Sequence, residues 1–233
     1  MAQRPLFIPQ LDRSSLVRTT MVTFEWFPGL STSQKQRSVE SLHAAARHLG
    51  AIDRILEVSS KSKDRLGVAL SAFNLTLTER RLPRRLSVEC AFQGSKVFEK
   101  GGPFTDIFGM SSREAKQDVR IKASGPLVGF RFLNVDWPLE PRTAFYDWLY
   151  ITALRQNPDL AKSVSDYQAF TDIEFNPKTS INCQAYAVAL YVSLRQRGLL
   201  GSSALDKVSF LRLVQGRPVG DAKQVDGKQG VLL

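Results

Sequence analysis

Histidine and cysteine are scarce in this sequence, which has two residues of each among 233. With only His43 and His48 available, a catalytic triad built on histidine is not expected. Cys90 and Cys183 lie in apolar stretches, which favours buried thiols in a reduced, cytoplasmic protein over a disulfide scaffold. No cysteine and histidine pattern has the spacing of a zinc site, so no metal or other cofactor is predicted.

Long apolar runs and familiar catalytic signatures are also missing. No apolar run reaches the ~18 residues of a transmembrane helix, and the N-terminal MAQRPLFIPQLDR has no signal-peptide layout, so no membrane partner is expected. The chain has no Walker loop, no G-x-G-x-x-G, no G-x-S-x-G and no H-E-x-x-H. Any catalysis should therefore rest on carboxylates, lysine and amides.

Positive charge is in clear excess. The chain has 32 Lys and Arg against 22 Asp and Glu, a formal net charge of +10. Such an excess favours a polyanionic partner, most simply nucleic acid or a phosphorylated ligand. The stretch TERRLPRR predicts an exposed basic loop with four arginines: Arg80, Arg81, Arg84 and Arg85.

Helical patterns outnumber strand patterns, and the two are interspersed, so the predicted class is α+β, mainly helical. Helices are expected over 31–50, 87–98, 138–155 and 182–198. Strands are expected over 54–60, 66–77, 126–137 and 167–175. The predicted organisation is an extended lead-in over 1–30, a catalytic domain over 31–213 and a disordered tail over 214–233.

The stretch SVECAFQGSKVF, Ser87–Phe98, has an unusual polarity. Wound as a helix at about 100° per residue, it places Glu89, Gln93 and Lys96 in a stripe of roughly 60°. Its other residues are apolar or small, whereas a surface helix has a broad polar face. We therefore expect a mostly buried helix with one thin polar seam. The seam suggests a site; the alternative is a Glu–Lys pair that satisfies itself in the core or at its rim.

Glutamate and lysine in a dry pocket suit a limited set of reactions. A buried carboxyl with a raised pKa can donate a proton to a leaving group or take one from water. A desolvated lysine can attack an anomeric carbon. Both fit cleavage of a glycosidic bond, for which a second acid is expected across the pocket. Asp172 and Glu174, in TDIEF, are the candidates.

Several motifs, in the same order, resemble the NADAR superfamily. They are LSAFN (Leu70–Asn74), VECAFQGSKVF (Val88–Phe98) and EAKQDVR (Glu114–Arg120), within a resemblance that spans roughly residues 66–198. More narrowly, FEWFPGLSTSQKQ, SVECAFQGSKVFEKGGPF and AFTDIEFNPKTSINCQA are similar to the branch associated with DarT-type DNA ADP-ribosyltransferase toxins. Members of that branch are implied to be antitoxins that remove ADP-ribose from guanine bases in DNA by hydrolysing the base–ribose N-glycosidic bond.

The resemblance also implies residue roles. Glu89 is expected to act as general acid/base, Lys96 to form a Schiff base or stabilise charge, and Asp172 to position ribose or water. The family's asparagine before the motif phenylalanine is Ala72 here, with Asn74 as its possible replacement. The expected substrate-binding residues are Ser71, Phe73, Asn74, Gln93 and Asn182. Trp148 and Tyr146 are candidates to line the pocket, with packing in the helix core as the alternative.

The implied partners are ADP-ribosylated DNA, the ADP-ribose product and a DarT-type toxin. The phosphates of such a substrate would account for the basic surface, with the Arg80–Arg85 loop as the expected contact. Two other functions fit the residues. One is an N-glycosidase acting on a small ribosylamino metabolite, and the other is a non-enzymatic module that binds nucleic acid or the toxin.

Overall fold

Short strands and helices alternate along the chain, which confirms the predicted α+β class. The structure is a computed structural model that describes residues 1–233 apart from 13–14, 51, 83–84, 202–204 and 216–233. The strands are β1 (Ala2–Pro9), β2 (Val17–Phe24), β3 (Ile55–Glu57), β4 (Thr76–Leu77), β5 (Leu86–Ser87), β6 (Lys96–Phe98), β7 (Leu127–Phe132), β8 (Val135–Trp137) and β9 (Ala169–Thr171).

The helices are mostly short, and two 3₁₀ turns, η1 (Thr105–Gly109) and η2 (Val164–Asp166), accompany them. The α-helices are α1 (Thr32–Arg47), α2 (Arg65–Ala69), α3 (Val88–Gly94), α4 (Ser112–Gln117), α5 (Arg120–Ala123), α6 (Ala144–Arg155), α7 (Pro158–Ser163), α8 (Gln184–Gln196) and α9 (Lys207–Val214). The domain limits given above stay predictions, and most of the predicted tail lies outside the described residues.

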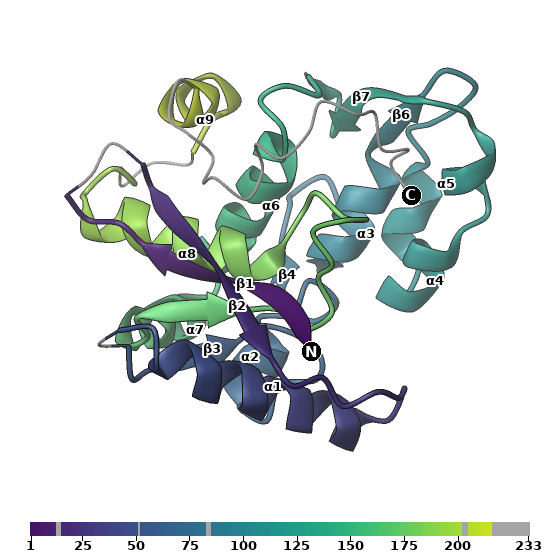
Figure 1. Ribbon diagram of the computed structural model, residues 1–233. Helices are drawn as coiled ribbons and strands as arrows, with labels where there is room; N and C mark the ends of the chain where they lie inside the picture. Colours follow the sequence, from purple (N-terminus) through teal and green to yellow (C-terminus); the bar gives the residue numbers. More distant parts are fainter. Residues whose placement is uncertain (13–14, 51, 83–84, 202–204, 216–233) are drawn as a thin grey trace.

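The largest sheet has the strand order β2-β1-β9-β3. β1 pairs antiparallel with β2 along its whole length and with β9 where Phe7 faces Phe170, while β3 runs parallel to β9. Figure 1 shows α1 on one side of this sheet and α8 on the other. Because neighbouring strand residues point to opposite faces, Leu6 packs in a cluster with Leu42 of α1, and Phe7 packs on Tyr186 of α8. The N-terminal segment is therefore an integral part of the main sheet.

Helix α3 lies between η1, α4 and α6. Its residues are all buried, which confirms the prediction of a buried helix. The prediction that the helix continues to Phe98 is wrong, because it ends at Gly94 and the chain enters β6 at Lys96. β6 pairs with β7, and the Ser95 carbonyl accepts a hydrogen bond from the Arg131 amide at 2.7 Å. The end of the predicted helix is therefore a strand, because it pairs with β7, which lies about thirty residues further along the chain.

Three other predicted elements also differ. The strand predicted over 126–137 is an antiparallel hairpin of β7 and β8, with its turn at Leu133 and Asn134. The strand predicted over 66–77 is the short helix α2, a turn and the two-residue strand β4. Asp64 begins α2, since its carboxylate accepts a hydrogen bond from the Leu66 amide at 2.8 Å. The helix predicted from Pro138 begins at Ala144, after Thr143 with a left-handed φ of 67°.

Candidate active site

Helix α3 holds a carboxylate and an amide side by side. Ser87 caps the helix by accepting a hydrogen bond from the Cys90 amide at 3.1 Å. One turn apart, Gln93 Nε2 donates a hydrogen bond to Glu89 Oε1 at 2.9 Å, and only 7% of Glu89 is exposed. The Gln93 Oε1 atom is buried and has no hydrogen-bond partner among the described residues. The Glu89–Gln93 pair therefore has unused hydrogen-bonding capacity in a dry setting.

Lys96 belongs to β6 yet lies in the same group. Its ammonium lies over the Phe92 ring, 4.9 Å from the ring centroid. Burial lowers the pKa of Lys96 to about 8, and the nearby Glu89 carboxylate opposes that shift. The spacing of the three seam residues thus places them together although the chain is not helical at Lys96. At neutral pH most Lys96 side chains carry a proton.

The LSAFN turn connects α3 to the C-terminal half of the chain. The Ala72 carbonyl accepts a hydrogen bond from the Glu89 amide at 2.9 Å. The Ala72 amide donates to Gln184 Oε1 of α8 at 2.7 Å. Beside this bridge, Ser71 Oγ is buried without a hydrogen-bond partner among the described residues. The main chain of one residue thus joins the Glu89 helix to α8.

Asp172 follows β9 and is 5% exposed. Its Oδ1 accepts hydrogen bonds from the Glu174 and Phe175 amides at 3.0 and 3.2 Å. Burial raises the pKa of Asp172 well above its usual range, the Glu57 carboxylate raises it further, and the contact with the Gln184 amide lowers it. Its surroundings therefore shift Asp172 toward the protonated form, and the turn at Glu174–Phe175 holds the carboxyl in place.

Tyr146 of α6 lies near both Glu89 and Asp172. Its ring packs edge-on against Phe92, with the centroids 5.2 Å apart. Burial raises the pKa of Tyr146 well above its usual range, and the charges of Glu89 and Asp172 both add to this rise. The phenol therefore stays protonated, and it lies close enough to interact electrostatically with both carboxyl groups. Tyr146, one of two aromatic candidates from the sequence, is placed with Glu89, Lys96 and Asp172.

The N-terminal hairpin contributes an arginine that sequence reasoning missed. Burial lowers the pKa of Arg4, and the charges of Asp172 and Glu174 oppose this shift, so the guanidinium lies near both acids. Arg4 Nε is buried without a hydrogen-bond partner among the described residues. The guanidinium also lies over Trp26, 5.3 Å from the ring centroid. A single arginine in the predicted extended lead-in gives no local signal of this proximity.

A second buried carboxyl, that of Glu57 on β3, lies near Asp172, and sequence reasoning missed it as well. Only 2% of Glu57 is exposed. It accepts hydrogen bonds from the Ser59 hydroxyl at 2.6 Å, the Thr171 hydroxyl at 2.7 Å and the Ile173 amide at 2.8 Å. His43 Nε2 lies 2.8 Å from the Thr171 hydroxyl, and burial lowers the pKa of His43 to about 4. This cluster holds the chain on both sides of Asp172.

Several residues predicted for the substrate site lie elsewhere or face other partners. Trp148 packs on Trp137 and donates from its indole nitrogen to the Leu205 carbonyl. Asn74 is exposed and its amide donates to the Val68 carbonyl at 2.9 Å. Neither side chain is brought to the Glu89 group by these contacts.

Phe73 and Asn182 are partly buried, and the predicted basic loop is only partly described. The Phe73 ring lies under the ammonium of Lys116, at 5.4 Å. Asn182 is in the loop before α8. Within the predicted basic loop, three of the arginines are exposed, and Arg84 lies outside the described residues: Arg80, Arg81 and Arg85 are the exposed ones.

Metal-binding clusters and membrane spans were sought throughout the part of the chain that the structure describes. That part holds no cluster of three or more His, Cys, Asp or Glu that would bind a metal ion. None of the helices described is long and apolar enough to span a membrane.

Helix α3, the LSAFN turn and the Asp172 turn all lie within a match to a known protein family. Residues 2–224 match the family described as DarT1-associated NADAR antitoxin. No curated protein matches the sequence. The family match covers nearly the whole chain and includes the N-terminal hairpin that carries Arg4. The chain therefore belongs to the DarT1-associated NADAR antitoxin family.

Proposed function

We propose that this protein removes ADP-ribose from guanine bases in DNA by hydrolysing the N-glycosidic bond between base and ribose. The observation that carries the proposal is the buried Glu89–Gln93–Lys96 group, whose carboxylate has one side-chain donor at 2.9 Å and whose lysine has a pKa lowered to about 8 by burial. The association with DarT1 supports a DNA substrate, and the net charge of +10 suits a phosphate backbone.

Glu89 acts as the general acid/base in this scheme. Its carboxylate takes a proton from water as the water oxygen bonds to the anomeric carbon of the ribose. The bond from that carbon to the guanine nitrogen breaks, and its electron pair goes to the nitrogen. Gln93 keeps the carboxylate oriented through its hydrogen bond at 2.9 Å. The products are free ADP-ribose and unmodified guanine.

Lys96 stabilises the negative charge that develops on the departing nitrogen and supplies its proton. With a pKa of about 8, the ammonium is the main form at neutral pH and is acidic enough for the transfer. Glu89 then passes the proton that it took from water to the neutral Lys96 amine, which restores both side chains. The net reaction consumes one water molecule. The alternative role, a Schiff base with the sugar carbon, needs the neutral amine.

Asp172 and Arg4 serve to hold the substrate. A protonated Asp172 can donate a hydrogen bond to a ribose hydroxyl or to the attacking water, and its pKa is raised in the sense that favours this form. The Arg4 guanidinium, near Asp172 and Glu174, is placed to meet a phosphate of the ADP-ribose group. The buried Ser71 hydroxyl, without a partner among the described residues, offers a further hydrogen bond.

The decisive experiment incubates the full chain with an oligonucleotide that carries ADP-ribose on guanine and measures the masses of the products. The expected result is free ADP-ribose and the unmodified oligonucleotide. An unchanged substrate mass would refute the proposal, and so would a product that retains the ribose on guanine. Turnover of a ribosylamino metabolite in place of the oligonucleotide would favour the small-molecule N-glycosidase. Protection against the toxin by a Glu89→Gln, Lys96→Met double variant would favour the binding module.

A further inference from the structure

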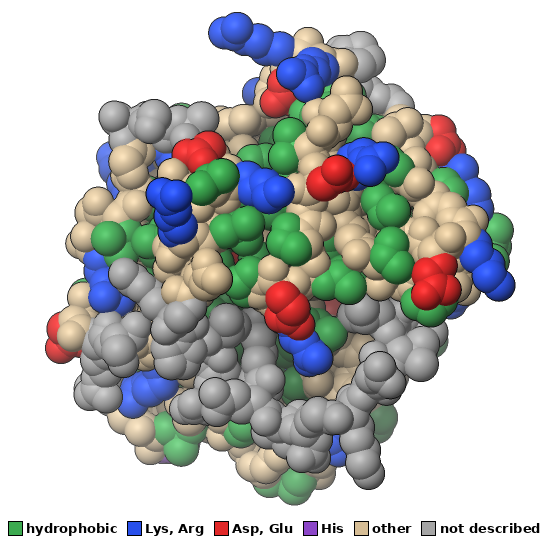
Figure 2. Space-filling model, turned by 90° about the horizontal axis from the view of Figure 1, so that it is seen from above, with side chains coloured by type: hydrophobic (Ala, Val, Ile, Leu, Met, Phe, Trp, Pro, Cys, Tyr) green, Lys and Arg blue, Asp and Glu red, His purple; other side chains and the backbone are tan. Residues whose placement is uncertain are grey.

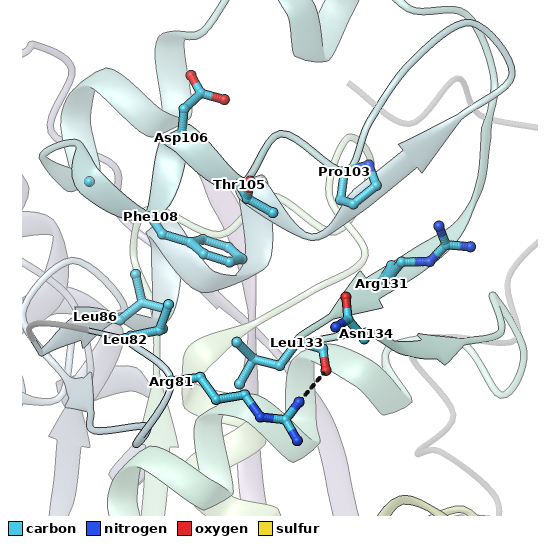
Figure 3. Close-up of a pocket in the computed structure, with 11 residues that line it drawn as sticks. Arg81, Leu82, Leu86, Pro103, Thr105, Asp106, Phe108, Arg131, Leu133 and Asn134 are labelled. Atoms are coloured by element: carbon cyan, nitrogen blue, oxygen red, sulfur yellow. Dashed lines mark hydrogen bonds between the residues drawn. The ribbon is translucent and has the colours of Figure 1, made fainter.

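A cleft of about 550 Å³ lies apart from the Glu89 group, between the basic loop, η1 and the β7–β8 turn. Figure 3 shows the Phe108 ring and Leu82 on one side of this cleft, Leu133 across from them, and Arg81 and Arg131 at its edges. We propose that the cleft binds a nucleotide of the single DNA strand next to the modified guanine. The base would lie against the apolar wall and the phosphate on arginine. This inference rests on the proposed function in taking DNA as the substrate.

The cleft lies behind the helix that carries the active-site carboxylate. A Cβ atom added to Gly94 would lie 2.6 Å from Phe108, so this ring packs directly on the helix backbone. Gly94 is about 140° around the helix from Glu89. At the other end, a Cβ on Gly102, next to the cleft residue Pro103, would lie 2.2 Å from the Lys96 carbonyl. The walls of the cleft thus pack directly on α3 and on β6, the two elements that carry Glu89, Gln93 and Lys96.

The charges of the cleft favour an anion. Arg81 Nη1 donates to the Leu133 carbonyl at 3.0 Å, a bond that fixes the guanidinium, and no acid among the described residues pairs with it. Arg131 Nε lies 2.5 Å from Asp136. The one acid of the lining, Asp106, pairs with Arg120 at 2.7 Å. Arg120 also pairs with Asp118 at 2.7 Å, so these ion pairs leave no spare positive charge. Arg81 is the lining arginine with no acid paired to it among the described residues.

The shape and lining of the cleft favour a nucleotide over a bare phosphate. Its volume of about 550 Å³ is within the range of sites for small ligands. Its walls include the Phe108 ring and the apolar side chains of Leu82 and Leu133. Proteins that bind single strands combine an aromatic surface for the base with a positive groove for the backbone. Where side chains are coloured in Figure 2, basic ones are scattered among acidic ones.

The first test measures binding of a short, unmodified, single-stranded oligonucleotide by fluorescence anisotropy at several salt concentrations. Arg81→Ala should weaken binding about tenfold at low salt, and the slope of log K against log salt should fall in magnitude by about 0.7. Arg212, exposed on α9, is the matched control, and Arg212→Ala should leave both quantities unchanged. Unchanged binding in Arg81→Ala, or an equal loss in both variants, overturns the proposal.

The second test fills the cleft without changing its charge. Thr105 lines the cleft and is exposed, so Thr105→Trp should fold normally, as checked by circular dichroism. The bulky ring should weaken oligonucleotide binding severalfold while the salt slope stays at its wild-type value, because no phosphate contact is lost. Wild-type affinity in the folded variant would show that no base enters the cleft and would overturn the proposal.

Both tests are independent of hydrolysis because the oligonucleotide carries no ADP-ribose. If the wild-type protein leaves a modified oligonucleotide intact but Arg81→Ala loses binding, the proposed function fails and the cleft stands. If hydrolysis proceeds and the cleft variants bind as the wild type does, the proposal for the cleft is refuted and the proposed function is retained.

Discussion

Two buried glutamates, Glu57 and Glu89, differ in how completely their carboxylates are satisfied. Glu57 accepts three hydrogen bonds of 2.6 to 2.8 Å, from two hydroxyl groups and one amide. Glu89 has the Gln93 amide at 2.9 Å, beside a half-buried lysine. A carboxylate that accepts three hydrogen bonds from the protein is largely satisfied and holds the fold, whereas one with a single donor has more capacity left for water or substrate. Burial alone does not separate the two roles.

Substitution of each glutamate by glutamine is the strongest test of this contrast. Glu89→Gln removes the proton acceptor but keeps size and the possible hydrogen bond, so turnover of ADP-ribosylated oligonucleotide should fall about 10³-fold. Its unfolding midpoint in urea should stay near the wild-type value. Glu57→Gln, the matched control, should retain most turnover. Comparable loss of activity in both variants would erase the distinction between a catalytic and a structural carboxylate.

Removing the Glu57 carboxylate altogether should cost stability. Glu57→Ala leaves two hydroxyl groups and the Ile173 amide without their buried acceptor, and it opens a cavity beside Thr171. We expect the free energy of unfolding to fall by about 3 kcal/mol, measured by urea denaturation. The same truncation at Glu89 should cost less, because it leaves one donor without a partner. An equal loss at both sites would contradict the assignment.

The pH dependence of hydrolysis tests the role of Lys96. The lowered pKa of about 8 means that the ammonium is lost as pH rises through 8. If the ammonium is the working form, kcat/KM is level below pH 8 and falls about tenfold per pH unit above it. Lys96→Arg should shift this fall to higher pH, and Lys100→Met, at an exposed lysine nearby, should leave the profile unchanged. A rise through pH 8, with an enzyme–sugar adduct trapped by borohydride, would instead support the Schiff base.

The smallest expected effect is at the rim of the site. Arg4→Ala should raise KM for the modified oligonucleotide about fivefold with little change in kcat, because it removes the proposed phosphate contact and leaves Glu89 and Lys96 in place. Arg18→Ala, at an exposed position at the far end of the same hairpin, serves as the control. A large loss of kcat in Arg4→Ala would place the guanidinium at the reacting atoms instead.

Local pattern was enough to identify the seam but not its surroundings. The spacing of Glu89, Gln93 and Lys96 predicted their grouping, which holds because only Ser95 separates the end of the helix from Lys96. The helix ends where the chain pairs with a strand that contains Arg131. Because Arg131 is far away in the sequence, the local periodicity of Ser87–Phe98 cannot predict this pairing. The same reason explains why Arg4 was missed.

The basic loop is the contrasting case. Its composition could be read from the sequence, but the cleft that it borders could not. Arginine-rich stretches predict exposure, and the described arginines of the loop are exposed. That Arg81 borders a cleft depends on η1 and on the turn between β7 and β8, where Leu133 has a left-handed φ of 51°. Elements brought together only by folding define such a site.

The bridge at Ala72 has a consequence for how this site can change in evolution. The Glu89 amide donates to the carbonyl of residue 72, and the amide of residue 72 donates to the Gln184 side chain, so the link does not use the side chain of this buried residue. The position where the related motif has asparagine can thus become alanine without separating the two halves of the site. The geometry of the acids can therefore be kept when the side chain at residue 72 changes within the space of this buried position. Proline, which has no amide hydrogen, is the one replacement that the bridge excludes outright.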